Sequence, residues 1–477
     1  MGKGVSFSYH GLHFEQHNLM TQLMTSLHDV LACPRCDAKL LDASGGGYQC
    51  KSCKTDFPVL DGIPVLFPEP QFSLAEWRER LHRLILQFKH DAQVMRRELQ
   101  QGKLLELTKK RLQLMVDAYQ DHVKRLQALL SPLDMKTMQA SFDAALALRT
   151  RLPQRQGLTT YYVNLHRDWC WGGKENDLAA QQVMSAVQGD KPERLLVLGA
   201  GGARLAYDIH RLLKPKLTVA LDINPLLLLA ARKITSGESV ELYEFPIAPK
   251  SIEDHAILRT LQASEKLDDN FHYVLADALH PPFAPGSFDM ILTPWFVDIL
   301  PEDLRNVVPR INRLLKLQGK WVNFGSLAFT HEAAASCYSL QEVLAILELT
   351  GFSDINVVEE LMPYMQSPAS RHGRIEQVMT LSAQKTTKAA KPTRYKSLPD
   401  WLIKNDLAVP LLPSFQTQSM STRIHAFIMA MIDGQRSIQD MALMLEQQRL
   451  MSRDEAEPAI RSFLTKMYEE QLRAKNF

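Results

Sequence analysis

Two pairs of cysteines near the start of the chain have the spacing of a metal site. Cys33 and Cys36 form one C-x-x-C pair, Cys50 and Cys53 form the second, and thirteen residues separate the pairs. Each pair can form a tight turn whose backbone amides face the thiolates, and a hairpin at 45–47 would bring the turns together. Four thiolates so arranged are typical of a closed structural zinc site. The alternatives to a zinc site are four free thiols or a redox-active pair, but neither of these requires two matched turns.

A glycine-rich run and two acidic residues farther along the chain suit a nucleotide-containing cofactor. The run Gly199–Gly202 follows the apolar segment 195–198, and Asp222 and Asp277 each end a later apolar segment. Asp222 is placed to bond both ribose hydroxyls, and Asp277 to reach an adenine amino group. The combination fits S-adenosylmethionine, although each acid taken alone could instead cap a helix. NAD(P) would share the loop and the first acid, but a third glycine is missing near Ala203 and no second dinucleotide half follows.

Short apolar segments alternate with helical patterns from Arg194 onward, and these elements must position the glycine run and the acids. Such alternation predicts an α/β fold with a doubly wound, Rossmann-like, mostly parallel sheet. In such a sheet the ligand lies at the carboxyl ends of the strands. The expected strands are 195–198, 217–222, 271–277, 288–293 and 320–325.

The nearly balanced charge of the chain hides an asymmetry between segments. The 477 residues, enough for about three domains, carry 55 basic and 53 acidic side chains, which excludes a dedicated polyanion binder on global charge. Residues 72–155 nevertheless hold 16 basic and 9 acidic side chains, a surplus of +7, whereas 156–383 hold 20 and 27, a deficit of −7. The opposite charges favour docking of the two segments and make the basic one a candidate wall of the active site.

The basic segment has the apolar spacing of helices. Apolar residues recur mostly at intervals of three and four from Leu74 to Phe88, and a second run extends from Ala92 to Leu130. Pro132 then precedes a third run from Met135 to Leu148. A solvated helical layer packed on a neighbouring domain, a polyanion-binding face and a lid over a substrate are all open interpretations.

Residues 400–477 follow a linker, 384–399, and have the pattern of a small, mainly helical module. An apolar stripe from Ile424 to Ile432 ends at Gly434, and Ser437 can cap the next helix, with a third helix expected over 453–471. The pattern Asp-Gly-x-x-Ser-Ile resembles small winged-helix and PqqD-like modules, which can hold peptide leaders. Simple packing or dimerisation, peptide binding and nucleic-acid binding are the open roles.

Neither a secretory signal nor a membrane-spanning run is apparent in the sequence. The longest apolar run, Leu226–Ala231, is far shorter than the roughly 20 residues that cross a bilayer. A cytoplasmic protein without a membrane partner is therefore expected, and the oligomeric state stays open.

The segment around the cysteines resembles the small zinc-ribbon activator subunits of tRNA methyltransferases. The likeness extends from Leu31 to Phe67 and is specific in the tail Asp61–Leu66. It implies a zinc ribbon over 1–70, counted with the N-terminal extension, that stabilises or activates a methyltransferase.

From about 155 to 383 the chain resembles the carnosine N-methyltransferases, after the helical segment 71–155. The similar motifs are an entry segment, the cofactor loop, a long insertion and two strand ends: 167–169, 199–201, 242–247, 295–298 and 321–325. This resemblance implies a class I S-adenosylmethionine-dependent methyltransferase domain over 156–383.

The family resemblance also implies cofactor contacts. Asn164 and Arg167 would contact the methionine end of the cofactor, and Gly199 would form the backbone niche for it. Asp222 would bind the ribose. Asp277 and Ala278 would contact the adenine. Gly201 in the loop and Thr293 at the end of the fourth strand are expected to contact the cofactor as well.

The family methylates an imidazole nitrogen, and Asp298 is the first candidate for orienting that acceptor. Imidazole has a pKa of about 6.5, so it is mostly neutral in the cytoplasm and needs the correct tautomer rather than a strong base. Asp298 would accept its N–H and offset the developing positive charge. His331 is the second candidate. The family places a substrate-contacting histidine shortly after the glycine that Gly325 matches, and His331 lies one residue farther from Gly325 than that spacing. A solvent-facing loop histidine is an equal interpretation of His331.

Two aromatic residues complete the expected acceptor site. Trp295 follows the fourth strand, and Tyr364 could replace a family tyrosine that has no counterpart near the last strand, where Arg374 stands. These departures favour an imidazole in a molecule other than carnosine. The run 293–296, Thr-Pro-Trp-Phe, also lacks the motif that grips planar amides.

Three hypotheses follow. The first is N-methylation of the imidazole of a histidine derivative or of a histidine-containing peptide or protein. The second is an RNA base methyltransferase, because some rRNA methyltransferases begin with a zinc ribbon; the deficit of −7 over 156–383 argues against nucleic acid. The third is a non-catalytic cofactor-binding regulator. Absence of the two strand-end acids would favour it, but Asp222 and Asp277 are both present.

Overall fold

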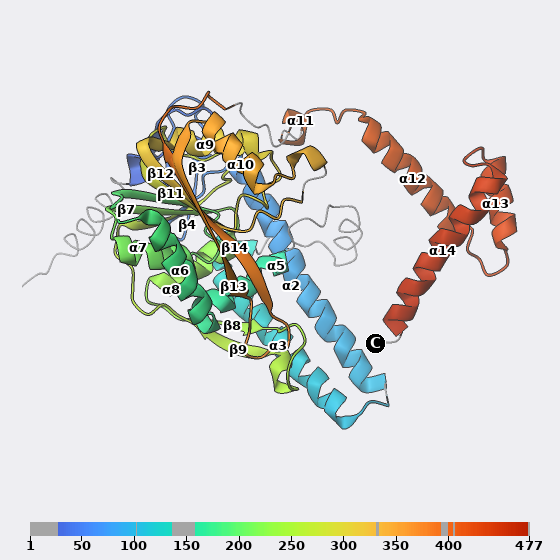
Figure 1. Cartoon of the computed structure of the whole chain (residues 1–477). Helices are drawn as coiled ribbons and strands as arrows, with labels where there is room; N and C mark the ends of the chain where they lie inside the picture. The colour runs from blue at the N-terminus through green and yellow to red at the C-terminus, as the bar shows by residue number, and fades with distance from the viewer. Residues whose placement is uncertain are drawn as a thin grey trace, which may run out of the picture. The chain divides into compact units, whose positions relative to one another are not determined.

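The chain divides into two compact units, Met1–Tyr395 and Lys396–Phe477 (Figure 1). The computed structural model describes residues 27–101, 103–135, 158–330, 333–392, 399–403 and 406–475. In these described ranges no helix is both long and apolar enough to cross a membrane.

A seven-stranded sheet forms the centre of the first unit, in the order β10-β7-β6-β11-β12-β14-β13. The first five strands in this order are parallel, β14 is antiparallel to β12, and β13 is antiparallel to β14. The predicted doubly wound α/β fold is therefore confirmed. The strands are β6 (Arg194–Leu198), β7 (Leu217–Asp222), β10 (Phe271–Leu275), β11 (Phe288–Pro294), β12 (Leu315–Gly325), β13 (Phe352–Tyr364) and β14 (Arg374–Lys385).

The two faces of the sheet are buried by different layers because side chains alternate along a strand. In β6, Leu195 and Val197 join one apolar cluster, and Leu196 and Leu198 join the other. The first cluster contains side chains of α6 (Gly173–Val187), α7 (Arg204–Leu213) and α8 (Pro225–Thr235). The second contains those of α9 (Leu304–Leu314), α10 (Leu340–Leu349) and the cysteine-containing segment.

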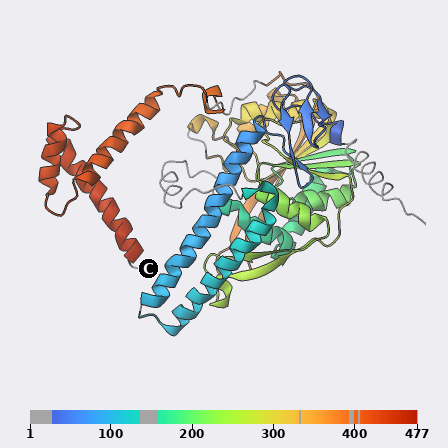
Figure 2. The same ribbon diagram turned by 180° about the vertical axis from the view of Figure 1, so that it is seen from behind.

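The cysteine-containing segment, 27–67, packs against the edge strand β10 and the loop that follows it (Figure 2). The Leu66 amide donates to the Leu275 carbonyl at 2.8 Å, and the Ala32 amide donates to the Pro282 carbonyl at 2.8 Å. An edge strand exposes unpaired backbone groups, and these bonds satisfy part of that edge. The segment contains β1 (Leu40–Asp42), β2 (Tyr48–Cys50), β3 (Asp56–Phe57), β4 (Val59–Leu60) and β5 (Ile63–Pro64).

The basic segment forms a pair of long helices, here called the arm: α2 (Pro70–Gln101) and α3 (Glu106–Leu129) (Figure 1). A short 3₁₀ turn, η1 (Ser131–Leu133), follows. The apolar pattern predicted one helical run from Leu74 to Phe88 and a second, continuous one from Ala92 to Leu130. This division is wrong: α2 continues to Gln101 and α3 begins only at Glu106, because polar residues on an exposed helical face interrupt the apolar pattern without ending the helix. The third expected helix, 135–148, lies almost wholly outside the described residues.

The arm docks on a hairpin inserted after α8, β8 (Val240–Glu244) and β9 (Ile257–Leu261), and on the 3₁₀ turn η4 (Glu253–His255). Arg125 pairs with Glu241 at 2.7 Å, and Lys110 pairs with Glu253 at 2.7 Å. Each pair joins a base of the arm to an acid of the segment 156–383. The docking that the opposite charges predicted is therefore present, although exposed pairs contribute only about 0–1 kcal/mol each.

His122 of α3 is fully buried at this interface. Its ring lies 4.9 Å from that of Phe88 and 5.4 Å from those of Tyr162 and Phe245, measured between centroids. Within the described part of the chain neither ring nitrogen has a hydrogen-bond partner. Burial lowers the pKa of His122 to about 4; the charge of Asp121 opposes this shift and that of Arg125 adds to it. The folded arm therefore holds this imidazole in its neutral form.

Replacing His122 with Phe should reduce the acid sensitivity of the fold. The unfolded chain protonates this histidine near pH 6.5 and the folded chain only near pH 4. The free energy of unfolding therefore falls as the pH drops through this window, by roughly 2–3 kcal/mol at most. His122→Phe should unfold at a higher temperature than the parent at pH 5, with a smaller gap at pH 7.5, in thermal scans at both values. A difference in melting temperature between variant and parent that is the same at both pH values would contradict this role. The control is His82→Phe, because His82 is a half-buried histidine of α2.

The second unit is helical in its described part, with a small apolar core of its own. The core packs Ile428 and Met431 against Met441, Leu445 and Ile460. Its helices are α11 (Asp400–Ile403), α12 (Pro413–Ala430), α13 (Ile438–Gln447) and α14 (Arg453–Lys475). As predicted, Ser437 caps α13, forming a reciprocal capping box with Asp440. The resemblance to PqqD-like modules stays a prediction.

Candidate active site

A cavity of about 570 Å³ opens at the carboxyl ends of β6, β7, β10 and β11. The order of the sheet reverses between β6 and β11, and a doubly wound sheet binds its ligand at such a point. The cavity brings together residues that the sequence analysis selected from six separate regions of the chain. Those that line it are Asn164, Arg167, Gly199, Gly201, Asp222, Asp277, Ala278, Trp295, Asp298 and Tyr364.

Asp222 fixes the shape of the glycine loop. Its Oδ2 accepts the Gly201 amide at 2.7 Å, and its Oδ1 accepts the Asn224 amide at 2.8 Å. Burial raises the pKa of this carboxyl, and the backbone N–H donors oppose the shift. Gly199 has φ +71°, and a Cβ there would lie 2.3 Å from a ring carbon of Phe296. No other residue fits at 199, so the backbone can approach a ligand closely.

Asp277, on the loop after β10, holds its own loop in place. Its Oδ1 accepts the Leu279 amide at 2.8 Å, and its Oδ2 lies 3.2 Å from Nδ1 of His280. Ala278 lines the cavity beside it. His280 was not selected from the sequence, and only its position three residues after the strand-end acid could have indicated it.

The entry segment forms a single π-helical turn, η3 (Arg167–Trp171), after α5 (Leu158–His166). Such turns are frequent at functional sites. Arg167 pairs with Asp168 at 2.6 Å and lies 5.5 Å from the ring of Tyr364. Burial opposes its charge, but the Asp168 carboxylate outweighs this, and the pKa of Arg167 is raised. The Trp169 indole donates to the Gly202 carbonyl at 2.8 Å, which ties the turn to the glycine loop.

Asp298 is a buried carboxylate of the cavity, with only 5% of its surface exposed. Its Oδ2 accepts the Ser326 hydroxyl at 2.5 Å and the Ala328 amide at 3.0 Å. Among the described residues, no hydrogen bond is made by Oδ1. The carboxylate is therefore held by one oxygen, and the other is available to a ligand.

Trp295 adopts an unusual backbone conformation next to Asp298. It has φ +48°, and its amide donates to the Phe324 carbonyl at 2.6 Å. A left-handed conformation at a bulky residue stores strain of about 1–3 kcal/mol and is concentrated at functional sites. A Cβ at Gly325 would lie 2.9 Å from the Trp295 Cα, so only glycine fits there. The indole lies 4.6 Å from the Tyr364 ring, between centroids, and the two form an aromatic wall.

One selected residue, Thr293, is not among the described residues that line the cavity. Thr293 is fully buried, where it donates to Asn323 at 2.8 Å and accepts the Trp321 indole N–H at 2.9 Å. These bonds place Thr293 between β11 and β12 rather than on the cavity surface. His331 lies outside the described residues.

The arm contributes two lining residues that the motif analysis missed, Trp77 and Arg80 of α2. The charge asymmetry had indicated the arm as a wall of the site, but it could not select residues. Ser326 and Ala328, which hold Asp298, were also missed because they lie in a loop without periodicity.

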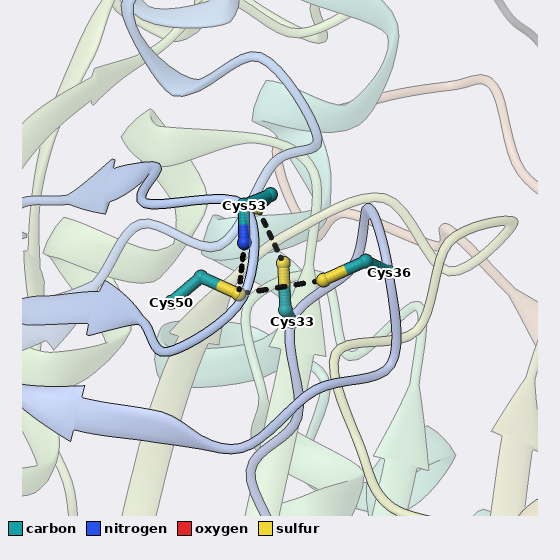
Figure 3. A group of neighbouring side chains, drawn as sticks. All are labelled: Cys33, Cys36, Cys50 and Cys53. Atoms are coloured by element: carbon teal, nitrogen blue, oxygen red, sulfur yellow. Dashed lines mark hydrogen bonds between the residues drawn. The ribbon is translucent and has the colours of Figure 1, made fainter.

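The four cysteines converge as their spacing predicted (Figure 3). Their sulfurs all lie within 4.8 Å of one another, with 3.6 Å between Cys33 and Cys53 and 3.3 Å between Cys36 and Cys50. A zinc ion with tetrahedral bonds of 2.3 Å separates its sulfurs by about 3.8 Å. The cluster therefore could hold zinc without a change of fold.

Comparisons with known proteins agree with this geometry. A family model described as a methyltransferase domain matches residues 196–322. The chain is 43% identical over 51 residues to UPF0434 protein MS0934 of Mannheimia succiniciproducens, which is 10% of this chain and 84% of that protein.

Solved methyltransferase structures are similar at low identity. A phosphoethanolamine N-methyltransferase 2 of Haemonchus contortus, bound to phosphomonomethylethanolamine and S-adenosylhomocysteine, is 16% identical with a TM-score of 0.29. The match covers 43% of this chain and 52% of that one, so this chain spans about half of that enzyme. NodS from Bradyrhizobium japonicum, bound to S-adenosylhomocysteine, is 14% identical with a TM-score of 0.31, covering 47% of this chain and 98% of that one. The chain contains a class I S-adenosylmethionine-dependent methyltransferase domain and, over a 51-residue stretch, belongs to the UPF0434 family.

Proposed function

We propose that this methyltransferase N-methylates the imidazole of a histidine derivative or of a histidine-containing peptide or protein. The observation that carries the proposal is Asp298. It is a buried carboxylate on the acceptor side, one of its oxygens is held by Ser326 and Ala328, and the other is available. An imidazole N–H is a donor that this free oxygen can accept.

The proposed chemistry needs positioning more than a strong base. S-adenosylmethionine supplies an electrophilic methyl group on a sulfonium, and the acceptor nitrogen must present its lone pair in line with it. By accepting the N–H of the other ring nitrogen, Asp298 would select the tautomer with the lone pair toward the methyl. The same carboxylate would offset the positive charge that develops on the ring. Trp295 and Tyr364 would hold the ring plane between aromatic surfaces.

The cofactor is proposed to bind against the glycine loop, with Asn164, Arg167 and Asp222 beside it. The fit rests on this chain's own geometry. Gly199 leaves a space that any Cβ would fill, a buried carboxylate, Asp222, ends β7, and the half-buried Asp277 follows β10. Zinc is proposed for the four cysteines in a structural role, since four thiolates leave no open coordination position.

Replacing Asp222 with Ala should weaken cofactor binding by about 10- to 100-fold, because hydrogen bonds to a charged group are worth about 1.5–3 kcal/mol. The loss has two causes, a missing ribose acceptor and a loop released at Gly201. Titration calorimetry with S-adenosylhomocysteine measures it. Asp190→Ala is the control and should retain near-parental affinity, because Asp190 pairs with Lys320 at an exposed position and does not line the cavity. Equal affinities for parent and Asp222→Ala would contradict the assignment.

The function is tested by incubating the purified protein with methyl-labelled S-adenosylmethionine and three acceptor pools. These are histidine dipeptides, a cell peptide extract and total RNA. Label in the dipeptides or peptides, located on an imidazole nitrogen by fragmentation mass spectrometry, supports the proposal. Label in RNA alone overturns it in favour of a nucleic-acid methyltransferase. Cofactor binding with no label in any pool overturns it in favour of a regulator.

A further inference from the structure

One wall of the cavity comes from outside the methyltransferase-like segment. Trp77 and Arg80 of α2 line the same cavity as Asp298 and Trp295, although they precede the matched domain by more than a hundred residues of chain. Trp77 is anchored: it is 8% exposed and belongs to the apolar cluster that contains Leu74 and Leu81. The arm therefore places a rigid indole, with a guanidinium beside it, on this wall.

Among the residues that the structure describes, four arginines line the cavity, and their partners differ. Arg167 pairs with Asp168, which lines the cavity itself, and these side chains are only 15% and 6% exposed. Arg204 pairs with Asp208, and these side chains are 23% and 13% exposed. Both pairs are mostly buried, and breaking one would leave a buried charge without its partner. These two guanidiniums therefore already have buried carboxylate partners, and Arg167 is in addition assigned to the cofactor.

The remaining two arginines are Arg374 and Arg80. Arg374 pairs with Glu376, a carboxylate that also lines the cavity, so this pair adds no net charge to it. Arg80 pairs with Glu76 one turn back on α2, and Glu76 is not a lining residue. The side chains of Arg80 and Glu76 are 39% and 45% exposed. Such an exposed i,i+4 pair is worth only about 0.3–0.5 kcal/mol, so a ligand can replace Glu76 at little cost.

The position of Arg80 also determines which ligand group it fits. Its guanidinium carbon lies 5.2 Å from the centroid of the Trp77 ring, an arrangement that supports the positive charge through the indole face. A guanidinium held in this way keeps N–H donors at its edge, and two of them match a planar carboxylate. A lysine at this position would offer a point charge without that match.

We propose that the acceptor carries a carboxylate and that Arg80, supported by Trp77, binds it, which makes the arm a specificity-determining part of the acceptor site. The proposal rests on the proposed function, since it assigns the second end of the molecule whose imidazole Asp298 orients. Arg80 acts on binding and takes no part in methyl transfer.

The test uses two probes that differ in a single group: a histidine dipeptide with a free carboxylate and the same dipeptide as its carboxamide. Binding of each is measured by titration calorimetry with S-adenosylhomocysteine present, and turnover is measured with labelled S-adenosylmethionine. The proteins are the parent, Arg80→Gln, and the control Arg83→Gln. Arg83 forms the analogous i,i+4 pair with Glu79 on α2 but does not line the cavity.

For the parent, the acid should bind roughly 10- to 100-fold more tightly than the amide. Arg80→Gln should lose this preference through a higher Kd and KM for the acid, with kcat, amide binding and cofactor affinity unchanged. Arg83→Gln should behave as the parent. Equal binding of acid and amide by the parent, or an unchanged preference in Arg80→Gln, overturns the carboxylate site.

The two proposals fail in distinguishable ways. Carboxylate-dependent binding without methyl transfer would overturn the proposed function and leave the Arg80 site standing. Methyl transfer to both probes with equal KM would overturn the Arg80 site alone. If neither probe binds, the Arg80 site is overturned, and label in the cell peptide extract decides the proposed function. A melting temperature of Arg80→Gln within a degree or two of the parent excludes loss of fold as the cause.

Discussion

Replacing Asp298 with Asn is expected to lower kcat by roughly 10²- to 10⁴-fold, the range of a positioned acid–base group, while the affinity for S-adenosylhomocysteine stays near that of the parent. Asn has the same size and keeps one oxygen that Ser326 and Ala328 can hold. It loses the negative charge, and its amide can turn an N–H donor toward the acceptor. An imidazole would then be offered a donor where it needs an acceptor, and the reactive tautomer would be disfavoured.

The measurement separates catalysis from folding and from cofactor binding. Single-turnover rates with labelled S-adenosylmethionine give the chemical step, calorimetry gives cofactor affinity, and thermal scans report the fold. Asp289→Asn is the matched control: it lies near the opposite end of β11, where it holds the Arg194 amide and Lys316. It should retain kcat. Collapse of cofactor affinity in Asp298→Asn, or an unchanged kcat, would show that Asp298 does not orient the acceptor.

Removing the metal from the cysteine cluster is expected to give the second-largest effect. Zinc in such a site is worth about 10–16 kcal/mol in isolated peptides, and its loss should lower the unfolding midpoint by roughly 10 °C or more. The reason lies in where the segment docks. Its residues Leu40, Tyr48 and Phe57 share an apolar cluster with Phe283, and Leu66 pairs with the end of β10. Loosening this segment would release the loop that carries Asp277 and should raise the cofactor Kd.

Metal analysis by mass spectrometry should find one zinc per chain in the parent and much less than one in Cys50→Ser. Thermal scans before and after chelation then measure the stability term, and calorimetry measures the cofactor Kd. Cys337→Ser is the control, because Cys337 is exposed and lies outside the cluster. A parent protein that folds and binds cofactor equally well with the metal stripped away would contradict a structural role.

Much of the site was predictable because its residues lie at the ends of strongly patterned elements. Short apolar segments predicted the strands β6, β7, β10 and β11, so the residues at their carboxyl ends could be selected from the sequence. Residues 199, 222, 277 and 298 among them line the cavity. The cysteine spacing was equally local. Thr293 shows the limit of this reasoning. The end of a strand was identified, but whether its side chain faces the cavity or the next strand depends on the sheet's register.

The extent of the arm helices was less predictable. The apolar pattern placed the division between the two helical runs just after Phe88, yet α2 continues to Gln101 and α3 begins at Glu106. Helix continuation on an exposed face depends on propensity and on the partner α3, and neither leaves a regular apolar stripe. His122 likewise has no signature in the sequence, because a histidine on a helix is buried or exposed according to what docks on it.

The sequence by itself determined the local chemistry of this protein: four thiolates at metal spacing, a glycine loop, strand-end acids and a carboxylate, Asp298, after the fourth strand. These follow from short-range spacing along single elements. Only the tertiary structure decided that the arm supplies Trp77 and Arg80 to the acceptor cavity, and that Ser326 and Ala328 leave one oxygen of Asp298 available. Such contacts join segments far apart in the chain, and they arise from packing and charge complementarity that no local pattern encodes.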